Sequence, residues 1–441
     1  MTNPPAPPPP QPSPPTDPAA QPPGDHPAGR KPALGFIFVT LLLDVLGFGL
    51  LIPVAPKLIR SLMGVGETAE GIAAAATMFG WLVSTYAAMQ LIFSPILGAL
   101  SDRFGRRPLL LVSMFGSGLD YFAMAFSPNL AFLFITRALN GISGASMTVC
   151  SAYVADVTPP EKRAGAFGMI GAAFGIGFVV GPVLGGVLGS IDIHLPFYAA
   201  GGLSLANWLY GYFVLPESLP RERRSRFSLE KANPIGAVAG LGRYPMVAGM
   251  VGALFLMNLA MFGLHATWVN YTEYRYKWES WQVGLSLTVV GIGAAAVQGG
   301  LARKVIPALG PGKAGERRAL LIGAFIGMLA YVGYGLASEG WMIYSIVLVA
   351  SLGGIAQPAF QAIVTKTVKP DEQGLVQGAM GSLQSGAQIL GPLIATSAFS
   401  YAISKEATPP YNVPGLSFFI GACLCGLGLI VATWATRNIR A

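Results

Sequence analysis

The sequence is poor in charged side chains. Lys, Arg, Asp and Glu together make up 11% of its 441 residues, whereas an ordinary soluble domain has about 25%. Hydrophobic residues make up 53% of the chain, and 57 glycines add to the non-polar part. So few polar side chains cannot cover the surface of a water-soluble fold of this length. The composition therefore excludes a soluble globular protein and indicates one surrounded by lipid.

Cysteine and histidine are also scarce. The three cysteines, Cys150, Cys423 and Cys425, are too few for a disulfide framework. The three histidines lie in unrelated places, and no HExxH, GxSxG or P-loop motif occurs. We therefore expect no metal site and no cofactor, and the sequence disfavours a membrane-embedded enzyme, which would need a nucleophile–base pair or metal ligands.

Basic residues outnumber acidic ones by 28 to 20, but they form no single patch that would suit a nucleic acid. They lie in short clusters between apolar runs, which is a signal of membrane topology. With the N-terminus inside, 22 of them fall in inward-facing loops and 5 in outward-facing loops. This bias requires an even number of spans. We expect a multi-pass protein of the bacterial inner membrane, with both termini cytoplasmic.

Apolar runs repeat along the chain. Each is close to the roughly 20 residues that a helix needs to cross hydrocarbon, and a helix satisfies all its own backbone amides there. We expect twelve spanning helices, over residues 33–56, 72–99, 108–127, 129–153, 164–188, 196–215, 245–268, 281–301, 318–337, 341–364, 374–399 and 414–435.

Polar segments divide the chain into regions. Residues 1–32 form a proline-rich, low-complexity cytoplasmic tail, either a disordered arm or a polyproline ligand. Residues 216–244 form a basic cytoplasmic linker that contains the run RERRSRF. It separates an N-terminal six-helix bundle, residues 33–215, from a C-terminal one, residues 245–441.

An internal repeat supports this division. The motif VTPPE at 157–161 recurs loosely as VKPDE at 368–372. Four more positions recur 210 residues later: Gly168 as Gly378, Gly171 as Gly381, Gly181 as Gly391, and Pro182 as Pro392. We therefore expect an all-α membrane protein whose two pseudo-symmetric six-helix halves surround a central cavity, as in secondary transporters.

Four ionisable residues interrupt the apolar runs: Asp44, Asp120, Arg137 and His265. A charge near the bilayer centre costs about 3 kcal/mol on insertion scales, so such residues usually face a partner or a cavity. One interpretation is a structural ion pair of Arg137 with either acid. The other is that at least one aspartate takes up and releases a proton during transport, because two acids outnumber the one base. His265 fits simple packing as well.

The loop between the second and third runs reads GALSDRFGRRP, residues 98–108. Gly98 permits close helix approach and Gly105 a tight turn. The acid Asp102 lies among three arginines, Arg103, Arg106 and Arg107, which suggests a breakable charge network that could hold one conformation.

The fifth run carries a glycine every fourth residue. Gly177, Gly181, Gly185 and Gly189 share one helix face, which suits close helix packing. Pro182 removes one backbone donor and can bend the helix. Tight packing explains this face, and a pliable face between the halves would also serve a change of conformation.

The sequence resembles the major facilitator superfamily, and within it the tetracycline-resistance drug/proton antiporters. The resemblance rests on the following segments: the aspartate of the first run, GALSDRFGRRP, GLDYFAMAF, RALNGISGA, AYVADVT, GFVVGPVLGG, RYKW, GGIAQPAFQAI and QILGPL. It covers nearly everything from Leu34 to Trp434.

The resemblance implies roles for particular residues. Asp44 and Asp120 would couple transport to protons. Gly98, Asp102, Arg103, Gly105, Arg106 and Arg107 would form a cytoplasmic gate loop, with Arg137, Asp156 and Arg163 in a charge network. The antiporter motif would comprise Gly177, Gly181, Pro182, Gly185 and Gly186. Candidates for the substrate cavity are Gln90, His265, Gln298, Gln357 and Gln361.

The chain departs from this family in its second half. The tetracycline exporters carry a histidine in helix eight and an aspartate in helix nine, and the matching positions here are Ala294 and Gly327. The nearby Gln298 does match. Tetracycline as the substrate is therefore in doubt, more than export itself.

These features lead to one main expectation and one alternative. The main expectation is proton-coupled export of a small amphipathic drug, by a protein that works as a monomer in the lipid bilayer. The alternative is uptake or facilitated diffusion of a small metabolite by the same fold.

Overall fold

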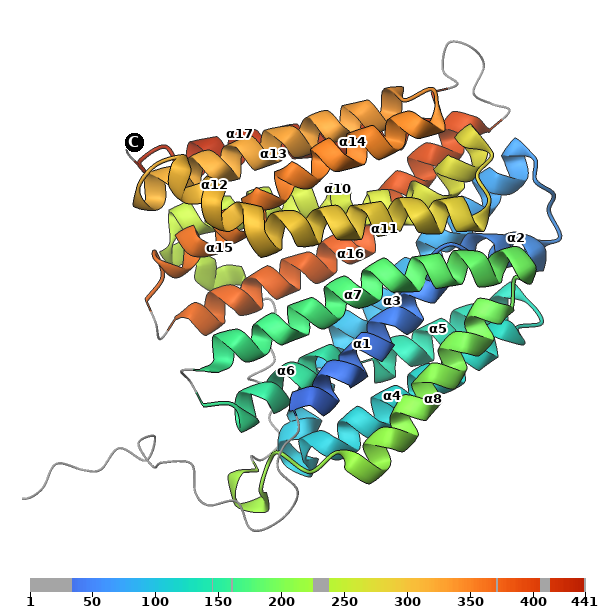
Figure 1. Ribbon diagram of the computed structural model, residues 1–441, viewed down its shortest axis with the longest axis horizontal. Coiled ribbons are helices and arrows are strands. Elements are labelled where there is room, and N and C mark those ends of the chain that lie inside the picture. The colour runs from blue at the N-terminus through green and yellow to red at the C-terminus, as the bar shows by residue number, and fades with distance from the viewer. Residues whose placement is uncertain are drawn as a thin grey trace, which may run out of the picture.

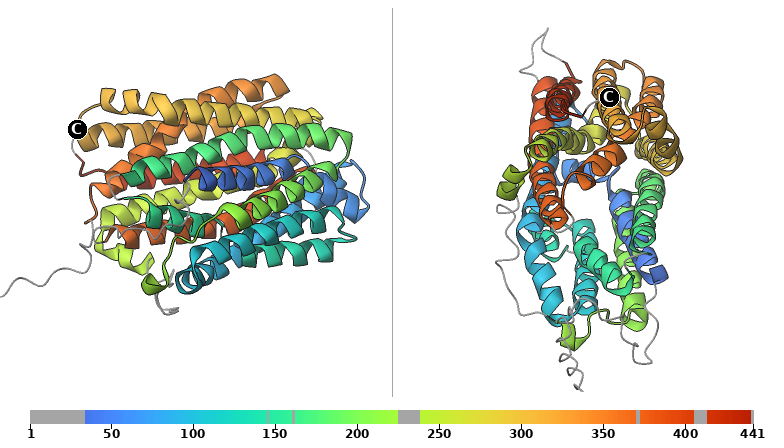
Figure 2. Two further views of the ribbon diagram at one scale, coloured as in Figure 1. Left: turned by 60° about the horizontal axis from the view of Figure 1, so that its bottom comes forward. Right: turned by 90° about the vertical axis from the view of Figure 1, so that its left-hand side faces the viewer.

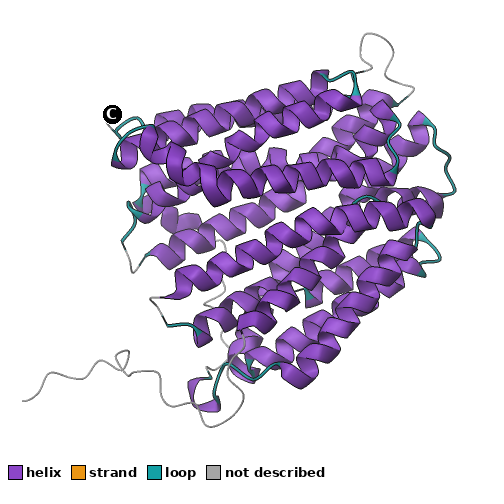
Figure 3. Ribbon diagram, in the orientation of Figure 1, coloured by secondary structure: helices purple, strands orange, loops and turns teal. Residues whose placement is uncertain are grey.

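The computed structural model describes residues 34–144, 146–159, 162–224, 238–369, 372–404 and 413–439. Within these ranges the chain is built of helices and contains no strand (Figure 3). Apolar runs become helices because a helix satisfies its own backbone polar groups in lipid. The expected tail, residues 1–32, lies outside the described residues, as does 225–237 of the linker.

The helices before the linker are α1 (Leu34–Leu51), α2 (Ala55–Met63), α3 (Ala69–Phe104), α4 (Arg106–Ala125), α5 (Leu130–Ser143), α6 (Ser146–Val157), α7 (Arg163–Ile191) and α8 (Leu195–Val214). Those after it are α10 (Pro245–Tyr276), α11 (Ser280–Ala296), α12 (Ala302–Ala308), α13 (Gly312–Leu336), α14 (Gly340–Leu352), α15 (Ala356–Thr365), α16 (Gln373–Ile403) and α17 (Leu416–Ala435).

Each run expected to span the membrane contains a helix. Among the described residues, ten helices are long and apolar enough to cross a bilayer, or eleven if α1 and α2, which meet at 45°, form one broken span. Helix α8 has 20 residues but is less apolar, because Asn207 and three tyrosines interrupt it. The segment after Pro56 was expected to be a loop, but it belongs to α2.

Two of the spans change helix type at membrane depth. A π-helical turn over Val297–Leu301 joins α11 to α12, and a 3-10 turn over Gly353–Ile355 joins α14 to α15. The two irregular turns contact each other. Irregular backbone at this depth is tolerated where protein buries it or where it lines a water-filled space.

The helices run side by side as one bundle (Figure 1). Helices α1–α8 form one side of it and α10–α17 the other, and α7 packs on α11 while α3 packs on α16 (Figures 1 and 2). We call the end at which α1 begins and α17 ends the terminal end. The other end, which carries α2, is the far end.

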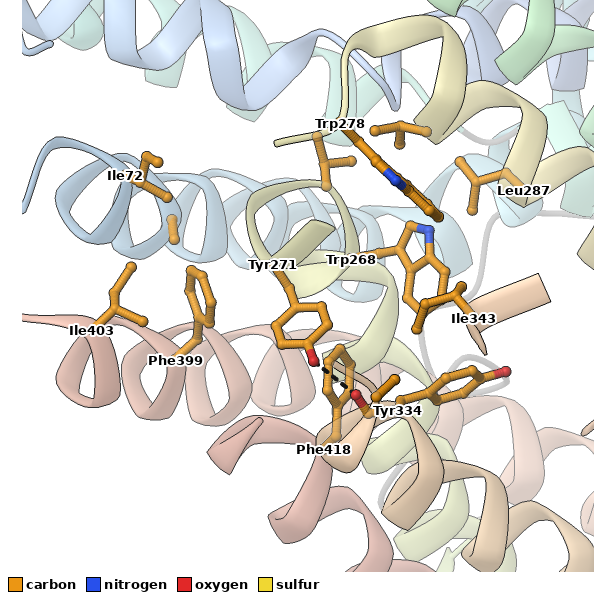
Figure 4. Packing of buried hydrophobic residues seen from close by; sticks show 14 of the residues in the cluster. Ile72, Trp268, Tyr271, Trp278, Leu287, Tyr334, Ile343, Phe399, Ile403 and Phe418 are labelled. Atoms are coloured by element: carbon orange, nitrogen blue, oxygen red, sulfur yellow. Dashed lines mark hydrogen bonds between the residues drawn. The ribbon is translucent and has the colours of Figure 1, made fainter. Parts of the chain in front are cut away.

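Among the described residues, buried apolar side chains form four clusters, and one of them joins the two sides of the bundle. It lies toward the far end and brings Ile72 of α3 against Phe399 and Ile403 of α16 (Figure 4). Trp268 and Tyr271 of α10 belong to the same cluster. The two sides of the bundle are thus sealed together near the far end.

Candidate functional site

Asp120 lies inside the N-terminal side of the bundle and is paired. Its carboxylate forms an ion pair with Arg137, and the side-chain amide of Asn140 donates a hydrogen bond of 2.6 Å to it. The Asp120 side chain is only 4% exposed. Of the two interpretations drawn from the sequence, the structure shows the ion pair of Arg137 with Asp120. This pairing offsets part of the cost of burying both charges away from water.

Asp44 lies near this pair without replacing it. Asp44 is half-buried on α1, and a Cβ at Gly47 on the same helix would lie 3.4 Å from the ring of Tyr121. The Arg137 guanidinium lies over the rings of Tyr86 and Tyr121, 5.7 and 5.9 Å from their centroids. Arg137 therefore contacts the faces of both tyrosines as well as the Asp120 carboxylate. The sequence did not point to these two tyrosines. Tyr86 lies four residues before Gln90 on α3, and Tyr121 directly follows Asp120 on α4.

Gln90 belongs to the same region. Its amide donates hydrogen bonds to the hydroxyl of Tyr86, at 3.3 Å, and to the backbone oxygen of Gly144, at 2.9 Å. Gly144 lies at the break between α5 and α6. The Gln90 side chain thus satisfies the backbone oxygen of Gly144, which the break in the helix leaves without an intrahelical donor.

The loop between α3 and α4 is organised around Arg106. Its guanidinium pairs with Asp102, at 2.5 Å, and with Asp156 at the end of α6, at 3.0 Å. It also donates a hydrogen bond of 2.5 Å to the hydroxyl of Ser101. The structure thus brings Asp102, Arg106 and Asp156 together as a charge network at the terminal end.

Glu217, just after α8, completes this network and was missed in the sequence. Its carboxylate accepts hydrogen bonds from the backbone N–H groups of Arg106, at 2.8 Å, and Arg107, at 3.3 Å. These are free donors at the start of α4, where a negative charge is also favoured by the helix dipole. Gly105 has a φ of 107°, and a Cβ there would lie 2.2 Å from the Glu217 carboxylate. The glycine is therefore required for this approach.

The other expected members of the network lie apart from Arg106. Arg107 donates a hydrogen bond of 2.6 Å to the backbone oxygen of Tyr212, and Arg103 lies over the ring of Phe104. Gly98 faces α6 across ordinary contact distance. Arg137 is in the membrane cluster with Asp120 instead. The side chain of Arg163 lies outside the described part of the chain.

The glycines of α7 pack against α1. A Cβ at Gly177, Gly181 or Gly185 would lie within 3 Å of α1 atoms, and at Gly185 it would lie 2.1 Å from the backbone oxygen of Leu50. This contact joins the helix that carries Asp44 to α7. The small-residue face expected from the sequence is therefore a packing face.

Pro182 and Gly186 mark a second face of α7, which meets α11. A Cβ at Gly186 would lie 2.4 Å from the backbone oxygen of Ser280, and one at Gly284 would lie 2.3 Å from that of Pro182. The hydroxyl of Thr288 donates a hydrogen bond of 2.8 Å to α7 as well. Helix α7 is therefore held between α1 and α11, one from each side of the bundle.

The remaining candidates lie on helices of the C-terminal side. His265 is exposed although it lies in the middle of α10, with the ring of Phe178 from α7 at 6.3 Å. Gln298, in the π-helical turn, and Gln357, in the first turn of α15, are also exposed, while Gln361 is half-buried. The two irregular turns thus bring Gln298 and Gln357 into one region.

Two charged residues at the far end were not expected to belong to a site. The sequence placed Arg60 among the basic residues of the outward-facing loops and gave Glu273 no role. Arg60 of α2 and Glu273 of α10 form an ion pair of 2.7 Å, and both side chains are buried. Their local signal is weak, because each lies just beyond the end of an expected apolar run, as many other loop charges do. Their pairing itself joins residues 213 positions apart, which no local pattern predicts.

Known proteins are similar to this chain in both sequence and fold. A family profile described as Major Facilitator Superfamily matches residues 37–392. The tetracycline resistance protein, class C, of Escherichia coli is 39% identical over 392 residues, which is 89% of this chain and 94% of that protein. The class B protein of Escherichia coli is 34% identical, over 83% of this chain and 88% of that protein.

Solved structures of transporters have a similar fold. The human organic anion transporter MFSD10 (TETRAN) superposes with a TM-score of 0.67 and 25% identity, and covers 90% of this chain and 98% of its own. A bacterial homologue of the human lysosomal transporter Spinster superposes with a TM-score of 0.71 at 16% identity, over 93% of this chain and 98% of its own. The chain therefore belongs to the major facilitator superfamily and is a multi-pass membrane protein of its tetracycline-resistance-like branch.

Proposed function

We propose that this protein is a secondary transporter that exports a small amphipathic drug in exchange for protons. The observation that carries the proposal is the presence of two acids at membrane depth, Asp44 and Asp120, of which Asp120 is paired with Arg137. The chain that carries them is 39% identical to a tetracycline resistance protein. A desolvated carboxylate can take a proton from one side and release it to the other. Asp44 and Asp120 are the proposed proton-coupling residues.

The proposed architecture has twelve spans in two pseudo-symmetric halves, residues 33–215 and 245–441, around a central cavity. It is supported by the starts of α7 and α16, since α7 begins at Arg163 and α16 begins 210 residues later at Gln373. The terminal end would then be cytoplasmic, in the bacterial inner membrane, with the tail and the linker on that side. The protein would work as a monomer.

In this scheme the network of Asp102, Arg106 and Asp156 is the cytoplasmic gate. It can open and close because its ion pairs join separate helices and are partly hydrated. The α7 faces at Gly181 and Gly186 would transmit movement between the halves. Gln90, His265, Gln298, Gln357 and Gln361 are the proposed cavity residues.

The substrate is proposed as a drug-like compound and not as tetracycline in particular. Ala294 and Gly327 provide no side chain able to bind a proton where the exporters have a histidine and an aspartate. The alternative, uptake or facilitated diffusion of a small metabolite, would use the same cavity with flux in the other direction. The direction of flux under an imposed pH gradient separates the two.

The test has two steps. A growth-inhibition panel in a strain without its own efflux pumps identifies compounds that the protein exports. Everted vesicles are then energised, and proton release is recorded when such a compound is added. Asp44→Asn and Asp120→Asn should each reduce proton release, while Asp192→Asn, at an exposed acid of the far end, should not. Wild-type release by both membrane variants would refute the coupling assignment.

A further inference from the structure

The ion pair between Arg60 and Glu273 is unusual among the charge contacts of this protein. Arg60 belongs to the N-terminal side of the bundle and Glu273 to the C-terminal side, and their nitrogen and oxygen lie 2.7 Å apart. The two side chains are 6% and 10% exposed. The other ion pairs between described residues each stay within one side of the bundle. This pair therefore ties the two sides together.

The break after α1 places Arg60 in this position. Helix α2 leaves the axis of α1 at 45°, and Gly64, with a φ of 64°, ends it. A straight continuation of α1 would run parallel to its neighbours, whereas the bent α2 carries Arg60 to the end of α10. The bend is thus what allows a residue of the first span to reach the seventh.

The pair lies beside the apolar seal at the far end. The cluster that joins both sides of the bundle there includes Ile72 and Phe399 (Figure 4). Hydrogen bonds also cross the seal, because Ser84 donates to the backbone oxygen of Ile389 at 2.7 Å and Ser400 to that of Ala73 at 2.6 Å. Breaking the pair alone is therefore one step in opening a larger contact.

Several buried polar atoms in this region lack a partner among the described residues. They are the Oε2 atom of Glu273, both side-chain atoms of Asn270, and the hydroxyl of Ser280. Each such atom carries a desolvation cost that water would relieve if the far end opened. The ion pair and the apolar contacts thus stabilise the closed arrangement, while the unpartnered buried polar atoms destabilise it.

We propose that the Arg60–Glu273 ion pair is a latch that keeps the far end, the extracellular side of the transporter, closed. The pair separates when this side opens. The proposal rests on the proposed alternation of a transporter between two open states. A buried charge that loses its partner is strongly destabilising, so removing one member penalises the closed state. In the open state water can solvate the remaining charge.

A third residue makes the latch asymmetric. Arg60 also pairs with Glu67 at 3.1 Å, but Glu67 is 80% exposed and belongs to the same side of the bundle. If Glu273 is neutralised, Arg60 keeps this second partner. If Arg60 is neutralised, the Glu273 carboxylate remains buried without a cation. Arg60→Gln should therefore open the far end more than Glu273→Gln does.

The test measures conformation and not transport. The native cysteines Cys150, Cys423 and Cys425 are replaced by alanine, and a reporter cysteine replaces Ser280, which is 1% exposed and packs against α7. Intact cells are treated with a membrane-impermeant charged maleimide, and the labelling rate is measured. Full labelling after denaturation in detergent shows that equal amounts of protein are compared.

Labelling should be slow in the parent and about tenfold faster with Arg60→Gln, which corresponds to a tenfold shift in the open population. Glu273→Gln should give a smaller increase. Glu67→Gln, the matched control, should label like the parent. The double exchange Arg60→Glu with Glu273→Arg, made together with Glu67→Gln so that no second carboxylate lies against position 60, should restore slow labelling, because it rebuilds the pair with reversed polarity.

Two results would overturn the latch. One is a labelling rate for Arg60→Gln and Glu273→Gln equal to that of the parent. The other is fast labelling by the double exchange in a protein that melts at the temperature of the parent. Failure of the unmodified protein to export any compound would instead refute the proposed function, and it would leave the labelling results as they stand.

Discussion

Arg106 and Glu316 occupy corresponding places near the start of α4 and α13, 210 residues apart, and carry opposite charges. Each is paired: Arg106 with Asp156, and Glu316 with Lys366. The partners are also 210 residues apart. An ion pair depends on opposite charge and not on which helix carries which sign. The reversed pair therefore supports the proposed duplication more strongly than the shared glycines do, because its two positions must change together.

The Glu217 carboxylate should be needed for the stability of the gate loop. Glu217→Ala removes the acceptor of the N–H groups of Arg106 and Arg107, and losing such a cap costs about 1–2 kcal/mol. Thermal unfolding in detergent, followed by tryptophan fluorescence, measures this loss. Glu222→Ala, at an exposed acid five residues later, is the control and should leave the melting temperature unchanged. Equal melting of both variants would contradict the capping role.

Gly105 should tolerate a side chain less well than another glycine of positive φ. Gly64 has a φ of 64° with nothing near its absent Cβ, whereas a Cβ at Gly105 would meet the Glu217 carboxylate. Gly64→Ala should cost about 1 kcal/mol through the backbone alone. Gly105→Ala should cost about 2 kcal/mol or more, since it adds a clash to a conformation open almost only to glycine. The comparison of their melting temperatures fails if Gly64→Ala is the more damaging.

The Asp120–Arg137 pair should behave as a buried unit. Asp120→Asn leaves the Arg137 guanidinium without its anion and should destabilise the protein by about 3–5 kcal/mol. Combining it with Arg137→Gln should recover most of the loss, because no charge then stays unpaired. Unfolding by denaturant of the two single variants and the double variant measures the coupling. A double variant as unstable as the sum of the singles would show that the pair contributes nothing as a pair.

The contact of α7 with α1 should depend on the absence of a side chain at Gly185. Gly185→Ala places a Cβ against the backbone of Leu50, and such overpacking costs about 1–3 kcal/mol. Gly175→Ala, on the same helix but with nothing within 4 Å, should be neutral or stabilise by about 0.5–1 kcal/mol, because alanine favours a helix. Gly185→Ala should therefore lower the melting temperature, whereas Gly175→Ala should leave it unchanged or raise it.

Glu372 should make stability depend on pH at the terminal end. Hydrogen bonds from the hydroxyl of Tyr244 and from Arg243 hold the pKa of this carboxyl below its usual 4.5. A carboxyl with a lowered pKa stabilises the fold above its unfolded pKa, and the contribution is lost as the pH falls through the folded pKa. Tyr244→Phe should therefore lower the melting temperature above about pH 5.

The difference between the wild type and Tyr244→Phe should shrink as the pH falls well below about 4, where the carboxyl is protonated in both states. The measurement is the melting temperature of each protein across a pH series in detergent. Tyr401→Phe, at an exposed tyrosine of the far end, is the control and should show no such pH dependence. A constant difference between wild type and Tyr244→Phe at every pH would contradict the assignment.

The positions of the spanning helices were open to prediction because a helix in lipid needs only its own backbone and about 20 apolar residues. Helix α7, for instance, extends over Arg163–Ile191 where residues 164–188 were expected. The details of helix type were not open to prediction. The π-helical turn over Val297–Leu301 carries Gln298, Gly299 and Gly300, but these residues alone do not select a π turn over an α turn. The bend before α2 does have a local signal, because Pro53 lies in the break between α1 and α2.

Part of the candidate site could be predicted from the sequence for a similar reason. Asp44, Asp120 and Arg137 are conspicuous because charge is costly in an apolar run. Glu217 and Glu273 are not conspicuous, since each lies at the end of a run among other polar residues. Their importance comes from partners more than 100 positions away, Arg106 for Glu217 and Arg60 for Glu273.

The sequence by itself determined that this chain is helical, embedded in lipid and built from apolar spans, because these properties depend on composition and on spacing along one helix. Only the tertiary structure decided that Arg137 pairs with Asp120, that Glu217 caps α4, and that Arg60 meets Glu273 where the two sides of the bundle are sealed. A charge in a low-dielectric interior is stabilised by whichever opposite charge the fold brings within about 3 Å. That choice is made by the packing of distant helices, and the chain order does not contain it.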